Sequence, residues 1–462
     1  MNPRTRKLLE APIARTLLQL GGPNVLVLVA QAAVGLIETY FIGKLGVDAL
    51  SGVALVFPVV MLMQMMSAGA IGGGISSAIA RALGARRVDD ANALVLHACL
   101  VSVVFGLVFT AAAWLGGRVL YAGMGGAGPS LQVALTYSGW VFAGAVLIWL
   151  FNALASVVRG TGNMATPAVV TVAGMLVLIP LSPALIFGFG PLPRLGVAGG
   201  AIALLLYYLV GTVWLGIYVA RGRSVLKPSW RGFRVQRALL IDILRVGAAG
   251  AVSTVATNVA IAIATAFAGQ YGDAAIAGYG TGSRIEYLLV PLVFGVGGPL
   301  VAMVGTCIGA GNRRRALEAT WIGTAMVFVV TEAIGLAAAS FPAAWIGLFS
   351  SDPAVIAAGS LYLRAVGPFY GFFAIALILY FASQGAGRLG WPVAGNLARL
   401  AVAAAGGWLA TRQGWGLAGV FAAQSAALVV YALVNSIAVA GGSWFGPVGW
   451  PRTPVGLLRR FA

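Results

Sequence analysis

Three acidic side chains lie inside long apolar segments, where an ionisable group is costly. The chain has 462 residues and 11 acids, most of them in or near segments that we expect to be loops. Glu38, Glu286 and Glu332 lie instead within apolar runs. A charge at the centre of a bilayer costs about 2.5–3.5 kcal/mol on insertion scales, so such residues mark functional sites by default. Burial also favours the protonated carboxyl, which makes proton uptake near neutral pH a reasonable prediction for these acids.

Glu38 is the first candidate for an ion-coupling acid. Gln31 precedes it by seven residues, which is two helical turns, so both side chains point to one helix face. An amide there can hold the carboxylate or donate to a cargo. The competing interpretation is a glutamate at a helix end, because Gly43 follows five residues later.

The other two intramembrane acids are less easily assigned. Glu286 follows Arg284 by two residues, a spacing that does not place them on one helix face. Glu286 therefore either binds cargo or pairs with another arginine, such as Arg364. Glu332 lies near the middle of its apolar run with no nearby cation in the sequence, and the face that it lines stays open.

Neutral polar residues in the apolar runs are candidates for lining a binding cleft. Tyr137, Asn152 and Asn258 belong to this group. The alternative for each is a hydrogen bond between helices, which contributes about 0.6 kcal/mol on average in membranes.

Composition sets the framework that must position these residues. Hydrophobic residues make up 60% of the chain and charged residues only 9%, whereas a soluble domain has about 25% charged residues. Apolar runs without alternation, each long enough for the roughly 20 residues of a membrane helix, predict an all-α integral membrane protein with about twelve transmembrane helices. The runs are 16–42, 50–80, 92–116, 131–158, 166–190, 195–220, 240–268, 276–308, 317–349, 356–384, 392–411 and 415–440.

The two halves of the chain are copies of one unit. The segment from Gly21 to Gly52 recurs as Gly247 to Gly278, a spacing of 226 residues (269 − 43 = 226). Glu38 breaks the pattern, because its counterpart is Ala264. A duplication of this kind predicts two parallel six-helix repeats of a transporter.

Basic residues indicate the domain boundaries and the topology. We predict an N-terminal lobe over 1–220, a basic linker over 221–245 that holds seven cations, and a C-terminal lobe over 246–462. The other cation-rich segments fall on the same side as the linker, which the positive-inside rule makes cytoplasmic. Both termini are then cytoplasmic, in an inner (plasma) membrane, and the linker either lies on membrane lipids or is solvated.

Several classes of function are disfavoured. The formal charge of +18 follows the topology pattern and does not predict a nucleic-acid partner. His97 is the only histidine, and Cys99 and Cys307 lie in apolar runs, so no metal site is expected. Neither a catalytic triad nor a nucleotide-binding loop is recognisable, and we predict a monomer that is not an enzyme and needs no cofactor apart from a coupling ion.

Doubled motifs give the chain a family resemblance. The segment Glu38 to Gly46, the Gly84-Ala85-Arg86 turn and the Arg159-Gly160-Thr161-Gly162-Asn163 turn with Pro167 make up the first set. Second copies are Gly309-Ala310-Gly311-Asn312, and Gly385, Gly387 and Pro392 (385 − 160 = 225). Together these motifs resemble the multidrug and toxic compound extrusion (MATE) family over nearly the whole chain.

The resemblance implies a secondary transporter with two six-helix lobes facing a central cleft. Such proteins export organic, often cationic, small molecules in exchange for H⁺ or Na⁺ by a rocker-switch motion. Glu38 stands where bacterial members commonly carry an Asp, which implies that it couples transport to the ion. Ser182 replaces a second Asp that relatives place before Pro183, and Thr306 with Cys307 replaces Gln and Asn, which suggests a divergent, DinF-like branch.

A flippase of the same superfamily, acting on lipids or lipid-linked oligosaccharides, is the alternative function. Such flippases often have extra spans and a basic cavity. This chain has about twelve apolar runs and few cations within them: Arg284, Arg364 and Arg399.

Overall fold

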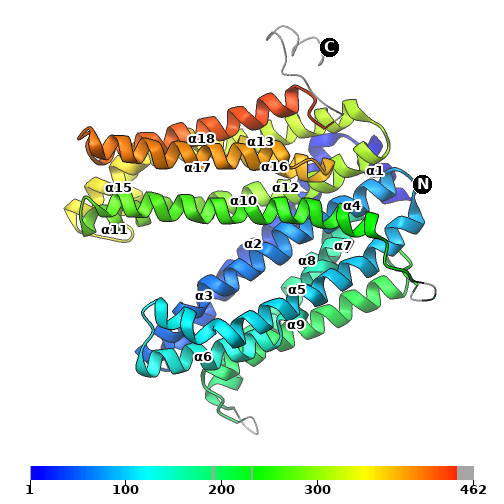
Figure 1. The fold of residues 1–462 in the computed structure, drawn as a ribbon, viewed down its shortest axis with the longest axis horizontal. Helices are drawn as coiled ribbons and strands as arrows, with labels where there is room; N and C mark the ends of the chain where they lie inside the picture. The colour runs from blue at the N-terminus through cyan, green and yellow to red at the C-terminus, as the bar shows by residue number, and fades with distance from the viewer. Residues whose placement is uncertain (1, 190–192, 230, 232, 445–462) are drawn as a thin grey trace. The chain divides into compact units, whose positions relative to one another are not determined.

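The structure is a computed structural model that describes residues 2–189, 193–229, 231 and 233–444. Every regular element within these residues is a helix (Figure 1). This is the expected outcome for an apolar chain, because a helix satisfies its backbone hydrogen bonds internally where lipid offers no partners. The predicted all-α class is confirmed.

The helices of the first half are α1 (Pro3–Glu10), α2 (Ile13–Gly43), α3 (Val47–Gln64), the π-helix η1 (Met65–Ile71), α4 (Gly72–Gly84), α5 (Val88–Gly123), α6 (Gly128–Ala143), α7 (Ala145–Gly160), α8 (Ala165–Phe187) and α9 (Val197–Ala220). Those of the second half are α10 (Arg237–Gly269), α11 (Asp273–Ser283), α12 (Glu286–Gly309), α13 (Arg313–Ser340), α14 (Pro342–Ile346), α15 (Pro353–Val366), the 3₁₀ turn η2 (Gly367–Phe369), α16 (Tyr370–Ala386), α17 (Gly390–Arg412) and α18 (Gly416–Ala440).

The number of possible membrane spans matches the prediction of about twelve. Among the described residues, 11 helical stretches are long and apolar enough to cross a membrane, or up to 12 if α6 and α7 count as one bent span. Those two helices meet at Gly144 with a bend of 48°. Three basic residues near the C-terminus, Arg452, Arg459 and Arg460, belong to the side predicted to be cytoplasmic. They lie outside the described part of the chain.

The chain forms two compact units. The first consists of residues up to Lys7 and Gly22–Gly247, and the second of Leu8–Gly21 and the described residues from Ala248 onward. Each unit thus takes the first turns of one long helix from the other half of the sequence. The division falls at Gly21 in α2 and at Gly247 in α10, which are equivalent positions of the repeat.

Specific contacts fix these exchanged segments within their units. In the first unit, Arg81 Nη2 of α4 forms an ion pair with Asp242 Oδ1 at the start of α10, 2.7 Å away. In the second unit, the Arg315 guanidinium of α13 donates to the Leu8 carbonyl at 3.0 Å and also to the Ala11 carbonyl.

A single additional residue distinguishes the first copy of the repeat from the second. Gly160 packs against the Ser76 backbone, and Gly385 packs in the same way against Val301, so the spacing here is 225 (301 − 76 = 225). The spacing at the start of the repeat is 226. One extra residue therefore lies between Gly52 and Ser76, the stretch that contains the π-helix, a form that absorbs an inserted residue as a bulge.

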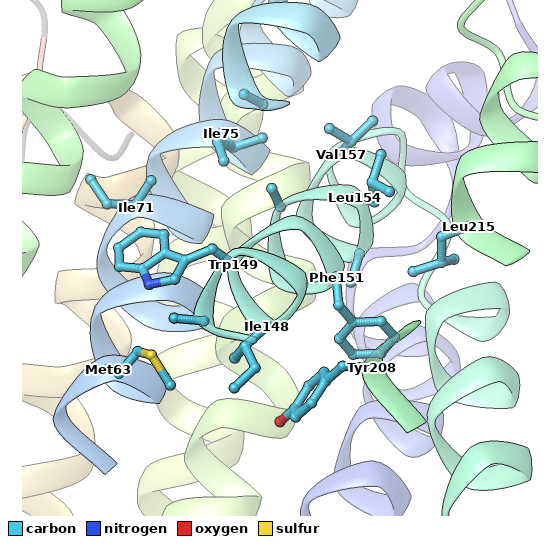
Figure 2. Close-up of a cluster of buried hydrophobic side chains, with 14 of the residues drawn as sticks. Met63, Ile71, Ile75, Ile148, Trp149, Phe151, Leu154, Val157, Tyr208 and Leu215 are labelled. Carbon is cyan, nitrogen blue, oxygen red and sulfur yellow. The ribbon is translucent and has the colours of Figure 1, made fainter. Parts of the chain in front are cut away.

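The core of the first unit packs around α7. Trp149 is 1% exposed and stacks on Phe105 of α5, with ring centroids 5.1 Å apart. Figure 2 shows Trp149 and Phe151 on α7 among side chains such as Met63, Ile75 and Leu215 from neighbouring helices. This packing holds α3, α7 and α9 in the register on which the polar residues described next depend.

Candidate functional site

Glu38 lies in the first unit next to two tyrosines. It is partly exposed on α2 and is close enough to Tyr137 of α6 and Tyr208 of α9 to interact with both electrostatically. Both tyrosines are buried, with 8% and 6% of their surface exposed. The structure thus brings together two predicted candidates, Glu38 and Tyr137, and adds Tyr208.

A hydrogen-bonded network orients Tyr208. The Asn152 Nδ2 group of α7 donates to Ser67 Oγ at 2.8 Å and to Gln64 Oε1 at 3.2 Å. The Gln64 Nε2 group donates in turn to the Tyr208 hydroxyl. Gln64 is the last residue of α3 and Ser67 belongs to the π-helix, so the network lies at the start of the π-helix.

The order of donors and acceptors leaves one proton available. Asn152 donates to Gln64 Oε1, which fixes the Gln64 amide so that its Nε2 points to Tyr208. The Tyr208 oxygen therefore accepts, and a phenol that accepts keeps its own O–H as a donor.

Three other predicted candidates lie outside this cluster. Gln31 is exposed, and no described hydrogen bond joins it to Glu38. Ser182 is buried within α8 at 1% exposure, and its Oγ has no hydrogen-bond partner among the described residues. Asn258 is exposed and donates to the Thr254 carbonyl of its own helix at 2.9 Å, so its described hydrogen bond does not join two helices, and its role in a cleft stays a prediction.

The second unit contains a comparable carboxylate. Glu286 Oε1, at the first residue of α12, accepts from the Tyr362 hydroxyl of α15 at 3.2 Å. Tyr370 donates to Tyr362 at 3.3 Å. Among the basic residues described, Arg399 is the one that acts on Glu286 electrostatically, and not the predicted Arg364.

The two carboxylates stand beside equivalent tyrosines. Gly52 packs on Val133 as Gly278 packs on Ala358, so the spacing at these helices is 225 (358 − 133 = 225) and Tyr362 is the counterpart of Tyr137. Glu286, in turn, is the counterpart of Val60 (286 − 60 = 226).

An acid is therefore present in both units but comes from different helices. In the second unit Ala264 replaces Glu38, and it is buried in the same apolar cluster as Tyr362. In the first unit Val60 replaces Glu286, in the same cluster as Tyr137. The two copies thus differ at Glu38 and Ala264 because the acid of each unit lies on a different helix, α2 in the first unit and α12 in the second.

Glu332 has a backbone partner. Its Oε2 accepts from the Gly371 N–H at 2.7 Å, at the beginning of α16. The first N–H groups of a helix have no partner within it, and a negative charge at this end interacts favourably with the helix dipole. The sequence shows no cation near Glu332. In the structure the N-terminus of α16 takes the place of a cation as its partner.

Sequence reasoning missed Gln64, Ser67 and Tyr208. Gln64 stands in a methionine-rich apolar run and is 144 positions from Tyr208, so nothing local pairs them. One signal was present: the spacing between copies changes from 226 to 225, which places an inserted residue in the stretch between Gly52 and Ser76 that contains Gln64 and Ser67.

The polar groups of each unit suit a proton or a small cation bound by one carboxylate and its hydroxyl neighbours. Within the described residues, no group of three or more His, Cys, Asp or Glu side chains could hold a metal ion.

Comparisons with known proteins agree with this architecture. A family model described as MatE matches residues 23–184 and 250–409. A FAD transporter of Shewanella oneidensis is 27% identical over 85% of this chain and 87% of its own. A probable multidrug resistance protein NorM of Thermotoga maritima is 26% identical over 82% of each chain. A solved structure described as the outward-facing conformation of a multidrug resistance MATE family transporter resembles the fold with a TM-score of 0.87, at 23% identity over 97% of this chain and 100% of that chain.

Proposed function

Because this chain belongs to the multidrug and toxic compound extrusion family, we propose that it exports organic small molecules in exchange for H⁺ or Na⁺, with Glu38 as the principal coupling acid. The observation that carries the proposal is the position of Glu38, an intramembrane carboxylate that is partly exposed and interacts electrostatically with Tyr137 and Tyr208. Such an acid can be reached by an ion and can change its charge.

The proposed exchange depends on competition. A cationic cargo is attracted by ionised Glu38, and a proton or Na⁺ that neutralises the carboxylate removes that attraction. Cargo and ion then never occupy the site together, and the lobes alternate by a rocker-switch motion. Glu286 is a second ion- or cargo-binding candidate of the same kind. The protein works as a monomer in the inner membrane with both termini cytoplasmic, in keeping with the distribution of its basic residues.

The test is transport of a fluorescent organic cation by the purified protein in proteoliposomes, with pH and Na⁺ gradients imposed separately. Glu38→Gln keeps the shape and removes the charge, so we expect gradient-driven export to be lost while the protein stays folded and monodisperse. Glu318→Gln is the matched control, because Glu318 forms an exposed pair with Arg314 on α13 and should export normally. Coupled export by Glu38→Gln would contradict the proposed role.

A flavin dinucleotide is a second candidate cargo. It is favoured by the resemblance to the Shewanella oneidensis FAD transporter, which covers 85% of this chain. The same vesicles, loaded with FAD in place of the cation, test it by the fluorescence released on imposing each gradient, and the absence of any gradient-dependent release would exclude it. Flipping of lipid-linked sugars remains the alternative from the superfamily.

A further inference from the structure

Arg399 is a cation placed deep within a membrane helix. It is the tenth residue of α17, which runs from Gly390 to Arg412, so at 1.5 Å per residue it lies about 14 Å along the helix axis. The hydrocarbon core of a bilayer is about 30 Å thick. Arg399 is therefore near the middle of the membrane, where an arginine is expensive and by default functional.

The surroundings of Arg399 leave its hydrogen-bonding capacity unused. Its guanidinium carbon lies 6.0 Å from the centre of the Tyr431 ring, and it interacts electrostatically with Glu286 and Tyr279. Within the described part of the chain, no ion pair or hydrogen bond of Arg399 is present. A guanidinium has five N–H donors, and Arg399 is partly exposed.

Arg399 is not what attaches α17 to α10. Asn396, one turn earlier, donates to the Ser253 carbonyl of α10 at 2.8 Å and to Thr257 Oγ1 at 3.1 Å. That bond already fixes the helix. A purely structural arginine would be expected to have a partner of this kind.

We propose that Arg399 binds an anionic group, a phosphate or a carboxylate, on an organic cargo. A guanidinium matches these groups with two parallel hydrogen bonds, and the buried Tyr431 ring lies beside it. The proposal rests on the proposed transport function and narrows its cargo, which then includes amphipathic anions and zwitterions as well as cations. Glu286 balances the arginine charge while no cargo is bound.

The test uses pairs of probes that differ only in the anionic group. Riboflavin and riboflavin 5′-phosphate share one ring system, and fluorescein and its carboxyl methyl ester supply the carboxylate arm. Binding to the purified full-length protein is measured by fluorescence quenching at one pH without any gradient, so the result does not depend on Glu38 coupling. Wild type, Arg399→Gln and Arg399→Lys are compared, with Arg364→Gln as control, because Arg364 is an exposed arginine near the end of α15.

We expect Arg399→Gln to weaken binding of the phosphate and the carboxylate probes by about 10- to 100-fold, the range of hydrogen bonds to a charged group. Riboflavin and the ester should bind as before. Arg399→Lys should recover part of the loss, and Arg364→Gln should cause none.

Two outcomes would overturn the proposal. One is a wild-type protein without preference for the anionic member of either pair. The other is an Arg399→Gln variant that loses both members of each pair equally, which indicates a structural role. If Arg399→Gln does not fold, Arg399→Lys decides: lysine cannot reproduce the two parallel bonds, so an undiminished preference for both anions would also refute it.

Discussion

Glu332 and Glu38 are both intramembrane glutamates, but their different surroundings indicate different roles. Glu38 interacts electrostatically with Tyr137 and Tyr208. Glu332 accepts from the Gly371 backbone at 2.7 Å, and Gly371 has no room for a side chain, since a Cβ there would lie 2.5 Å from Glu332 Oε2. We infer that Glu332 caps α16 and does not carry the transported ion.

This difference can be measured with one pair of variants. Glu332→Gln keeps an oxygen for the Gly371 N–H but loses the charge, so we expect a loss of about 1 kcal/mol in the free energy of unfolding, the difference between a charged and a neutral hydrogen bond. Coupled export should stay close to wild type.

Gly371→Ala should be more damaging, because the new methyl group displaces the carboxylate. Thermal unfolding in detergent measures the change in stability, and the proteoliposome assay measures coupled export. If Glu332→Gln removed coupling as completely as Glu38→Gln, Glu332 would belong to the ion pathway instead.

The π-helix is the element that most clearly separates the two copies. The extra residue of the first copy lies between Gly52 and Ser76, the stretch that contains the π-helix together with Gln64 and Ser67 of the network. A bulge of this kind tends to mark functional sites. Because the second copy manages without it, the fold itself does not need the residue.

Removing Met66 tests this interpretation. The deletion should turn Met65–Ile71 into ordinary α-helix, so the protein should still be extracted as a monodisperse peak. The shifted register should separate Ser67 and Gln64 from Asn152 and impair export.

Deleting Ala78, which is 1% exposed within regular α4, is the control. Loss of one residue there turns everything beyond it by about 100°, and we expect aggregation in size-exclusion chromatography. Equal tolerance of the two deletions would contradict the special status of the π-helix.

At the scale of the whole molecule, the sequence predicted the helical class, the number of spans and the family, because apolar run length and repeated glycines are local signals. It also singled out Glu38 and Tyr137, which are close together. It did not predict that Tyr362 pairs with Glu286, because that contact depends on how α12 and α15 pack. The role of Glu332 could not be predicted for the same reason. Its partner is the Gly371 backbone N–H, and a backbone group cannot be identified as a partner from residue types.

The exchange of helix starts between units bears on how the protein can be assembled. A chain cut between α9 and α10 gives one piece that retains residues 8–21 of the other unit and a second piece that retains residues 237–247 of the first. Neither half then owns a complete set of helices. Expressed alone, each should aggregate or be degraded, whereas halves produced together should co-purify through one affinity tag and recover export.

A first half that folded alone would show that the exchanged segments are dispensable. If neither half folds alone, each unit needs a helix segment from the other half of the chain. This requirement would explain why the two copies of the repeat stay joined in one polypeptide, because two separate chains would each lack part of a helix.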